Sequence, residues 1–153
     1  MDELSIREAT PADAEVLVHH RLGMFRDMGT DPAAVAALEE PSRIYFSRAV
    51  SDGSYRAWLV QTADGRVVSG GGIIILPWPS GPRDPYPRRV MILNMYTEPE
   101  YRRRGLARRL MEKMIAWCRE QGYKTVSLHA SDEGRPLYES LGFKPTNELR
   151  LTL

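Results

Sequence analysis

The spacing of apolar residues divides the chain into segments of helical and of extended character. Alternating or continuous apolar runs predict strands over residues 4–8, 55–61, 66–76, 90–97, 124–130 and 147–153. Apolar residues three and four positions apart predict helices over residues 10–28, 31–38 (resuming at 44–50), 103–121 and 132–140. This β-α-α-β-β-β-α-β-α-β order indicates one mixed α/β domain that spans residues 1–153.

The first predicted helix has defined ends and one unexpected residue. Thr10-Pro11-Ala12-Asp13 is a capping sequence, and Gly29 ends the helix. In the next helix, Glu39-Glu40-Pro41 predicts a break. Arg21 lies within the buried stripe of the first helix, so its guanidinium must reach a carboxylate, a carbonyl, a bound anion or water. The other residues of that stripe are Ala14, Leu17, Val18, Met24, Phe25 and Met28.

Two predicted strands contain residues that interrupt their apolar pattern. Gly70-Gly71-Gly72 is not followed by a phosphate-loop lysine, so we expect a bulge or a close backbone approach made for packing. Asn94 interrupts a strand that is apolar on both faces and therefore central. A buried Asn needs hydrogen-bond partners. It either orients a substrate or a water molecule, or it is a paired polar group of the core.

A basic segment follows the central strand. Residues 101–110, Tyr-Arg-Arg-Arg-Gly-Leu-Ala-Arg-Arg-Leu, join the turn Glu98-Pro99-Glu100 to a strongly amphipathic helix. The start of a helix presents free backbone N–H groups, and Gly105 lets a ligand approach them. The arginines add charge that suits phosphates or carboxylates. The segment predicts an anion site; a solvated helix start is the alternative.

The composition limits the partners of this site. The 21 basic and 20 acidic residues give a net charge of +1, which argues against a general nucleic-acid binder. Cys118, the single cysteine, falls on the apolar side of its helix, which favours a structural thiol. We expect no metal site, because the adjacent His19 and His20 face different sides of a helix. The chain has no apolar run of membrane-spanning length and no signal peptide, so we expect a cytoplasmic location.

Two motifs together resemble the GNAT superfamily of acetyl-CoA-dependent N-acetyltransferases. Arg102-x-x-Gly105-x-Ala107 is similar to the family's Arg/Gln-x-x-Gly-x-Gly/Ala loop, and residues 135–143, Arg-Pro-Leu-Tyr-Glu-Ser-Leu-Gly-Phe, are similar to its tyrosine helix. The resemblance implies a mixed, mostly antiparallel sheet flanked by helices, with acetyl-CoA between a bulged central strand and its splayed neighbour. The CoA contacts that it implies fall on Met95, Tyr96, Thr97, Arg102, Arg103, Arg104, Gly105, Leu106, Ala107, Arg108 and Ser131.

The resemblance also implies a reaction, in which a primary amine attacks the thioester and Tyr138 protonates the leaving thiolate. A half-buried packing tyrosine is the alternative. His129 is a candidate base because of its intrinsic pKa, with a water chain as the alternative. A backbone N–H near Met95 or Tyr96 would stabilise the oxyanion, with Asn94 nearby. Many relatives carry Asn and Ala where this chain has Ser131, which can cap the tyrosine helix, and Gly134, which weakens it.

The acceptor is predicted only in outline. In GNAT enzymes the first two helices border the acceptor pocket, so Arg21 is a candidate for holding an anionic group of the acceptor. Trp78 and Tyr86 lie in the proline-rich loop 77–89, which is a wall of the acceptor site, a plain surface loop or a homodimer contact. The alternative function is a non-catalytic acyl-CoA sensor on the same fold. Tyr138 argues against it, because binding alone needs no proton donor.

Overall fold

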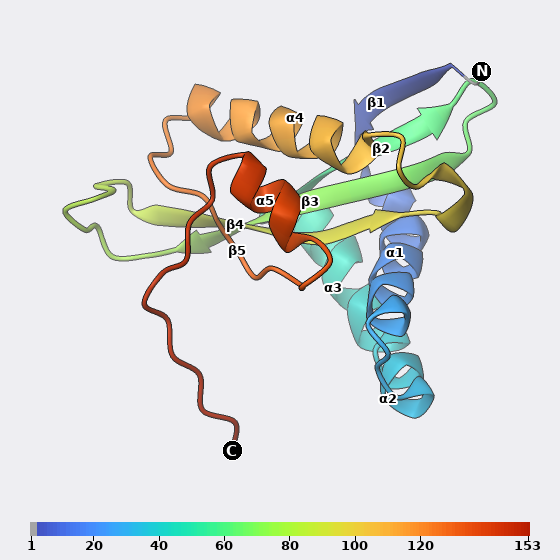
Figure 1. The fold of residues 1–153 in the computed structure, drawn as a ribbon, viewed down its shortest axis with the longest axis horizontal. Coiled ribbons are helices and arrows are strands. Elements are labelled where there is room, and N and C mark those ends of the chain that lie inside the picture. The colour runs from blue at the N-terminus through green and yellow to red at the C-terminus, as the bar shows by residue number, and fades with distance from the viewer. Residues whose placement is uncertain (1–2) are drawn as a thin grey trace.

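The computed structural model describes residues 3–153, which fold into one mixed sheet with helices on both faces (Figure 1). The five strands lie in the order of the sequence, and every neighbouring pair is antiparallel except the parallel pair β4 and β5. This confirms the expected fold class. The strands are β1 (Leu4–Glu8), β2 (Tyr55–Thr62), β3 (Val67–Pro77), β4 (Arg88–Thr97) and β5 (Ser127–Leu128).

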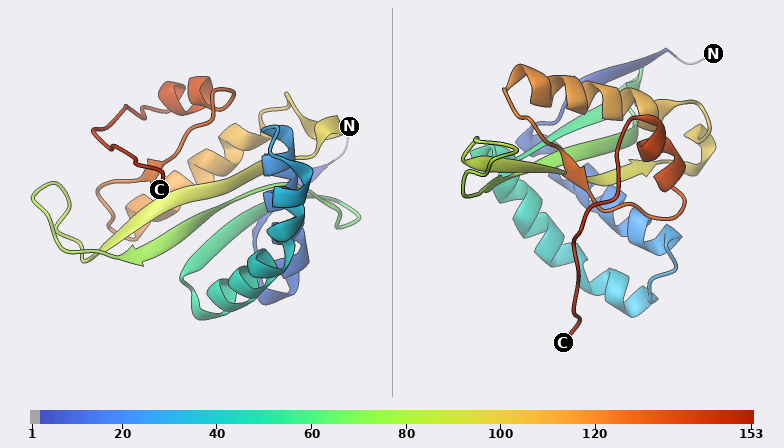
Figure 2. Two further views of the ribbon diagram at one scale, coloured as in Figure 1. Left: turned by 90° about the horizontal axis from the view of Figure 1, so that it is seen from below. Right: turned by 60° about the vertical axis from the view of Figure 1, so that its left-hand side comes forward.

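The helices form a layer on each face of the sheet (Figures 1 and 2). One layer holds α1 to α3, and the other holds α4 and α5. Two short 3₁₀ turns, η1 (Pro11–Asp13) and η2 (Pro99–Tyr101), precede α1 and α4. The helices are α1 (Ala14–Asp27), α2 (Pro32–Ala37), α3 (Glu39–Asp52), α4 (Leu106–Glu120) and α5 (Arg135–Ser140).

The alternation of side chains along β2 divides the core into two clusters. Trp58 and Val60 pack with the apolar face of α4, whereas Tyr55, Ala57 and Leu59 pack with α1 and α3. The residues that α4 buries are Leu106, Leu110, Met111, Met114 and Cys118. They match the predicted stripe, and burial raises the pKa of the Cys118 thiol to about 11, as expected for a structural cysteine.

The glycines of β3 make room for side chains from three other elements. A Cβ atom on Gly70 would lie 2.8 Å from the His20 ring, and one on Gly71 would lie 2.2 Å from the sulfur of Met95. A Cβ atom on Gly72 would lie 2.0 Å from the Tyr55 hydroxyl. The register between β3 and β4 also shifts between Gly70 and Gly72. The predicted close approach at these glycines is confirmed, and the extra residue of the bulge lies opposite them in β4.

Several predicted elements differ from the structure. Met28 is 58% exposed rather than buried, because it follows the last residue of α1. The helix expected to resume at residue 44 begins at Glu39, since Pro41 falls in its first turn, where a helix needs no N–H donor. β5 has two residues instead of seven, and residues 147–153 form no strand but lead away from the sheet (Figure 1).

Candidate active site

The centre of the site is a bulge in β4. Leu93 pairs with Gly72 and Tyr96 pairs with Gly70, so Asn94 and Met95 together face the single residue between those glycines. Asn94 has a φ of 62°, a left-handed conformation that Asn adopts more readily than most residues. Its side chain is buried, and its Nδ2 donates to the carbonyl of Leu17 in α1, 3.2 Å away. Asn94 is therefore buried as expected and hydrogen-bonded through Nδ2, whereas its buried Oδ1 has no partner within residues 3–153.

The bulge coincides with a split between β4 and β5. The two strands pair only at Met91–Ser127 and Ile92–Leu128, and then they diverge (Figure 1). From residue 93 to residue 97, β4 pairs with β3 on one side and has no strand on the other. The backbone groups on that free side can pair with an extended ligand as an added strand would.

The free side of β4 leads directly to the basic loop. Arg103 and Gly105 have φ values of 61° and 75°, so the chain turns sharply before α4. No side chain caps α4, and the first backbone bond onto the loop runs from Arg109 N to Gly105 O. The N–H groups of residues 106–108 are therefore available to an anion. A Cβ atom on Gly105 would meet nothing within 4 Å, which leaves this approach open.

Most of the loop arginines have structural partners. Arg102 pairs with Asp27 of α1 at 2.5 Å and donates from Nε to the carbonyl of Thr97 at 2.9 Å. Arg104 donates to the carbonyl of Glu100 at 3.1 Å. Within residues 3–153, the guanidinium of Arg103 has no ion-pair or hydrogen-bond partner, so it alone among these three is free to meet an incoming charge.

The tyrosine helix lies next to the start of α4. Arg108 donates from Nη2 to the hydroxyl of Ser140 at 2.7 Å, which ties the last residue of α5 to the first turn of α4. Tyr138 is half-buried, and burial raises the pKa of its hydroxyl. That hydroxyl forms no hydrogen bond with the rest of residues 3–153. It therefore stays protonated at neutral pH and has no internal acceptor for its proton.

The two departures at the tyrosine helix have physical explanations. A Cβ atom on Gly134 would lie 2.8 Å from the Tyr138 ring, so the ring packs directly on the glycine backbone. The hydroxyl of Ser131 accepts a hydrogen bond from the backbone N–H of Gly134 at 3.1 Å. Ser131 was expected to cap the tyrosine helix, but it closes the turn before α5, whose N-cap residue is Gly134 and which has no side-chain cap. The missing side chain of Gly134 makes room for Tyr138.

His129 lies just after β5 and faces outward. Its ring is 54% exposed, and its Nε2 lies 3.2 Å from a carboxylate oxygen of Glu148. The interaction also brings the ring within 3.5 Å of Arg150. The Nε2 atom thus has partners in the C-terminal segment. The role of His129 as a base stays a prediction.

Arg21 lies in the first helix as predicted, but its side chain is not part of the buried stripe. It is half-exposed rather than buried, and its guanidinium lies 5.0 Å from the centre of the Phe25 ring. No carboxylate within residues 3–153 pairs with it. Its charge lowers the pKa of Tyr45 and of the buried Tyr55, although burial has the larger, opposite effect on both. The Asn94 side chain also acts on Tyr55, so Arg21 belongs to the surroundings of the bulge.

The two candidate aromatic residues of the proline-rich loop lie elsewhere. Trp78 and Tyr86 flank the turn between β3 and β4, at the opposite end of β4 from the basic loop (Figure 1). Tyr86 packs on Tyr123, with ring centres 4.9 Å apart. The carboxylate of Asp84 accepts hydrogen bonds from the backbone N–H groups of Lys124 and Thr125 and fixes the loop to the segment before β5. The structure therefore does not bring these rings to the bulge, and their contact with an acceptor stays a prediction.

A polar pair at the end of β4 was missed by the sequence reasoning. The Nε2 of His19 in α1 lies 2.6 Å from a carboxylate oxygen of Glu98, which was interpreted as a turn residue only. The adjacent His19 and His20 were expected to face different sides of the helix, but their ring centres lie 5.9 Å apart and both rings pack on Tyr96, His20 at 5.2 Å. Burial lowers the pKa of His20 to about 4, and neither ring nitrogen has a hydrogen-bond partner within the described residues 3–153. A pairing between residues so distant in sequence leaves no local signal.

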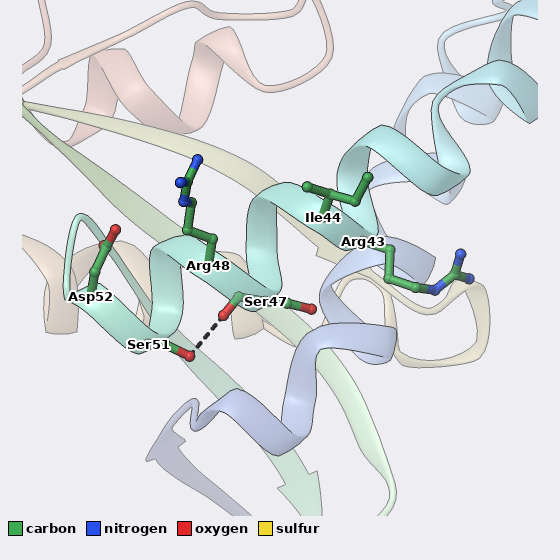
Figure 3. A pocket seen from close by; sticks show the side chains of 6 residues that line it. All are labelled: Arg43, Ile44, Ser47, Arg48, Ser51 and Asp52. Atoms are coloured by element: carbon green, nitrogen blue, oxygen red, sulfur yellow. Dashed lines mark hydrogen bonds between the residues drawn. The ribbon is translucent and has the colours of Figure 1, made fainter.

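A separate surface hollow lies along the outer side of α3 (Figure 3). Its polar groups have local partners, since Ser51 donates to the carbonyl of Ser47 at 2.7 Å and Arg43 pairs with glutamates of α1 and α3. It contains no buried polar group without a partner and is not next to the β4 bulge. The residues that line it are Arg43, Ile44, Ser47, Arg48, Ser51 and Asp52.

Comparison with known proteins gives the family to which this α/β fold and basic loop belong. The model of the acetyltransferase (GNAT) family matches residues 22–143, so the chain belongs to the GNAT family. Human N-acetyltransferase 8 is 31% identical over 64 residues, which are 40% of this chain and 28% of that protein. The chain thus matches under a third of the length of this curated relative.

Solved structures resemble the chain over almost its whole length. A GCN5-related N-acetyltransferase from Ralstonia eutropha JMP134 is 34% identical, with a TM-score of 0.93 over 99% of both chains. A protein from Clostridium acetobutylicum described as a predicted acetyltransferase, solved with acetyl-CoA, is 26% identical, with a TM-score of 0.90 over 98% of this chain and 96% of that chain.

Two further findings concern residues 3–153 only. No group of three or more His, Cys, Asp or Glu side chains is placed to hold a metal ion. None of the helices is both long and apolar enough to cross a membrane.

Proposed function

We propose that the chain transfers an acetyl group from acetyl-CoA to a primary amine by direct attack within a ternary complex. The observation that carries this proposal is the continuity of the free side of β4 with the uncapped start of α4. The free side of β4 suits an extended chain of amides, and the uncapped start of α4 suits a phosphate. Acetyl-CoA has both groups in series, and the protein from Clostridium acetobutylicum was solved with it.

The two ends of acetyl-CoA would meet different parts of the chain. The backbone N–H groups of residues 103–108 and the free guanidinium of Arg103 would hold the pyrophosphate. The backbone of Met95, Tyr96 and Thr97 would pair with the amides of the pantetheine arm. The thioester would then lie at the Asn94 bulge, where a backbone N–H of Met95 or Tyr96 would stabilise the oxyanion.

Proton transfer would complete the reaction. The acceptor nitrogen forms a bond to the thioester carbon, the carbon–sulfur bond breaks, and the sulfur leaves with the bonding electrons. Tyr138 would give its proton to that sulfur, since burial keeps the hydroxyl protonated. The proton of the attacking amine would pass to His129 or through water.

The acceptor would carry an anionic group. Arg21 is a half-exposed cation without a carboxylate partner in residues 3–153, in the surroundings of the bulge. A carboxylate on the acceptor would provide that partner and orient the amine. An acceptor that also contacted Trp78 would have to extend along much of β4.

The experiment is release of free CoA thiol from acetyl-CoA in the presence of a panel of amines, including amino acids and their carboxyl-amidated forms. We expect release that requires both an amine and the protein, with an acetylated product identified by mass. Tight acetyl-CoA binding without release for any amine would instead support a non-catalytic acyl-CoA sensor.

A further inference from the structure

An aromatic cluster lies between α3 and the sheet, and one of its rings reaches the surface. The ring of Tyr45 in α3 lies 5.3 Å from that of Phe46 and 6.2 Å from that of Tyr55 in β2, measured between centres. Phe46 and Tyr55 are 0% and 1% exposed, whereas Tyr45 is 37% exposed. Because two buried rings support it, Tyr45 offers a ligand an apolar surface that is already held in place.

The buried Tyr55 connects this cluster to the β4 bulge. A Cβ atom on Gly72, which pairs with Leu93, would lie 2.0 Å from the Tyr55 hydroxyl. Burial raises the pKa of that hydroxyl, and a hydrogen-bonding interaction with the Asn94 side chain acts in the opposite direction. The half-buried Leu93 packs against the same core cluster as Tyr55. The surface between the bulge and Tyr45 is therefore apolar.

Two charged groups lie close to the exposed ring. Burial raises the pKa of the Tyr45 hydroxyl, while the charge of Arg21 lowers it and the charge of Asp52 raises it. The Asp52 carboxylate is occupied, since it accepts from the backbone N–H of Ser54 at 2.8 Å and from the Ser54 hydroxyl at 2.6 Å. The Arg21 guanidinium has no carboxylate partner within residues 3–153. An anion beside Tyr45 would therefore bind on the Arg21 side of the ring.

We propose that the acceptor carries an aromatic ring with a carboxylate at the end remote from its amine, and that Tyr45 selects this acceptor by stacking on the ring. The inference rests on the proposed acetyl transfer, which brings the amine to the Asn94 bulge. The ring then lies on Tyr45, and the carboxylate pairs with Arg21. Tyr45 is thus a specificity-determining residue, and the substrate class is an aryl carboxylate with a primary amine.

The composition of this surface favours a ring over an aliphatic chain. An added ring extends a cluster that is already aromatic, and ring pairs contribute more than the area that they bury. The Arg21 guanidinium itself lies 5.0 Å from the centre of another ring, that of Phe25. A guanidinium both pairs with carboxylates and stacks on aromatic faces, so an aryl carboxylate satisfies both of its preferences. An aliphatic acid of the same length gains the ion pair only.

The test compares acetylation of para-(aminomethyl)benzoate with that of its saturated cyclohexane counterpart, which has the same charged groups at nearly the same separation. We expect KM to be roughly two- to tenfold lower for the aromatic acid, with similar kcat. Tyr45→Leu should abolish this difference by raising KM for the aromatic acid, whereas Tyr45→Phe keeps the ring and should preserve it. Ile44→Ala, at an exposed position of the hollow on the outer side of α3, is the control and should leave both KM values unchanged. Melting temperatures show whether the variants fold.

Binding measured without chemistry separates this inference from the proposed function. Calorimetry follows para-(aminomethyl)benzoate binding to the protein in the presence of free CoA, which has no acetyl group to transfer. Binding that weakens in Tyr45→Leu but not in Tyr45→Phe supports the inference even if no amine is acetylated, in which case the proposed function alone fails. Acetylation of both acids with equal KM, or unchanged KM and binding in Tyr45→Leu, overturns the inference and leaves acetyl transfer intact. Failure of the aromatic acid both to bind and to react overturns it as well.

Discussion

The side chain of Asn94 joins the bulge of β4 to the first helix, because its Nδ2 donates to the main-chain carbonyl of Leu17 at 3.2 Å. One residue therefore supplies both the left-handed backbone that creates the bulge and the contact that fixes its position against α1. The free side of β4 begins at this residue.

Replacing Asn94 separates these two contributions. Asn94→Gly keeps the left-handed backbone accessible and loses the hydrogen bond, at a cost of about 1 kcal/mol. Asn94→Val loses the same bond and adds roughly 1–3 kcal/mol of backbone strain. Thermal unfolding should therefore place valine below glycine by about 2–4 °C per kcal/mol of difference. Equal melting temperatures would show that the bulge does not depend on the conformation of this residue.

Substitutions at two glycines that flank α4 test whether the basic loop binds the pyrophosphate. Gly105 and Gly122 both have a positive φ, a Cβ atom on either would meet nothing within 4 Å, and they lie at opposite ends of α4. Gly105→Glu places a carboxylate where the pyrophosphate would bind, so we expect no detectable CoA binding by calorimetry. Gly122→Glu has comparable backbone strain and is expected to bind CoA normally. Unchanged CoA affinity in a folded Gly105→Glu protein contradicts the proposed phosphate site.

Tyr138→Phe removes the proposed proton donor and keeps the ring on Gly134. We expect kcat to fall on the order of 10²-fold while the affinity for CoA stays nearly constant. Because burial raises the pKa of Tyr138, the wild-type hydroxyl stays protonated into the alkaline range, and kcat should not fall there on its account. Tyr123→Phe, which removes a hydroxyl just beyond the C-terminal end of α4, is the control. Full turnover by Tyr138→Phe, with chemistry limiting the rate, would exclude the role.

Arg21→Met tests the anionic acceptor. The variant keeps much of the apolar stem over Phe25, so we expect a melting temperature close to the wild type. KM for a carboxylate-bearing acceptor should rise about tenfold or more, with little change for its amidated counterpart. Arg26→Met, an exposed arginine of the same helix, is the matched control. A large loss of stability with normal KM would instead make Arg21 a structural residue.

His20 predicts a loss of stability in mild acid. Burial, and to a lesser degree the neighbouring His19, lower its pKa to about 4, below the ordinary value of 6.5. Between these values the unfolded chain binds a proton that the folded protein does not, so stability falls as the pH falls. From pH 7 to pH 5 the loss from this residue is about 2 kcal/mol. Urea unfolding of the wild type and of His20→Gln at pH 7 and pH 5 measures this loss of stability. If the variant lost as much stability as the wild type, the loss would not come from His20.

The sequence predicted the local features of the fold better than its long-range ones. The glycines of β3 and the amphipathic α4 depend on neighbours in the sequence, and both are present in the structure. The bulge at Asn94 could be predicted only as a buried polar residue. Its conformation depends on pairing with β3, which no local pattern encodes.

The failures have one common cause, which is tertiary context. The segment 147–153 has a strand pattern, but a strand forms only beside another strand, and within residues 3–153 none lies next to it. Arg21 has the spacing of a buried residue, but the helix leaves its outer end uncovered. The pair His19 and Glu98 joins residues 79 positions apart. Such distances are not visible in helical or strand periodicity.

The carboxylate of Asp84 has a consequence at the opposite end of the sheet. It accepts from the N–H groups of Lys124 and Thr125 and from the Thr125 hydroxyl, all within 3.2 Å, just before β5 meets β4. This is the closed end of the wedge that the two strands form. The Asp84 carboxylate therefore fixes the proline-rich loop to the chain at the closed end of the wedge, at the opposite end of β4 from the basic loop.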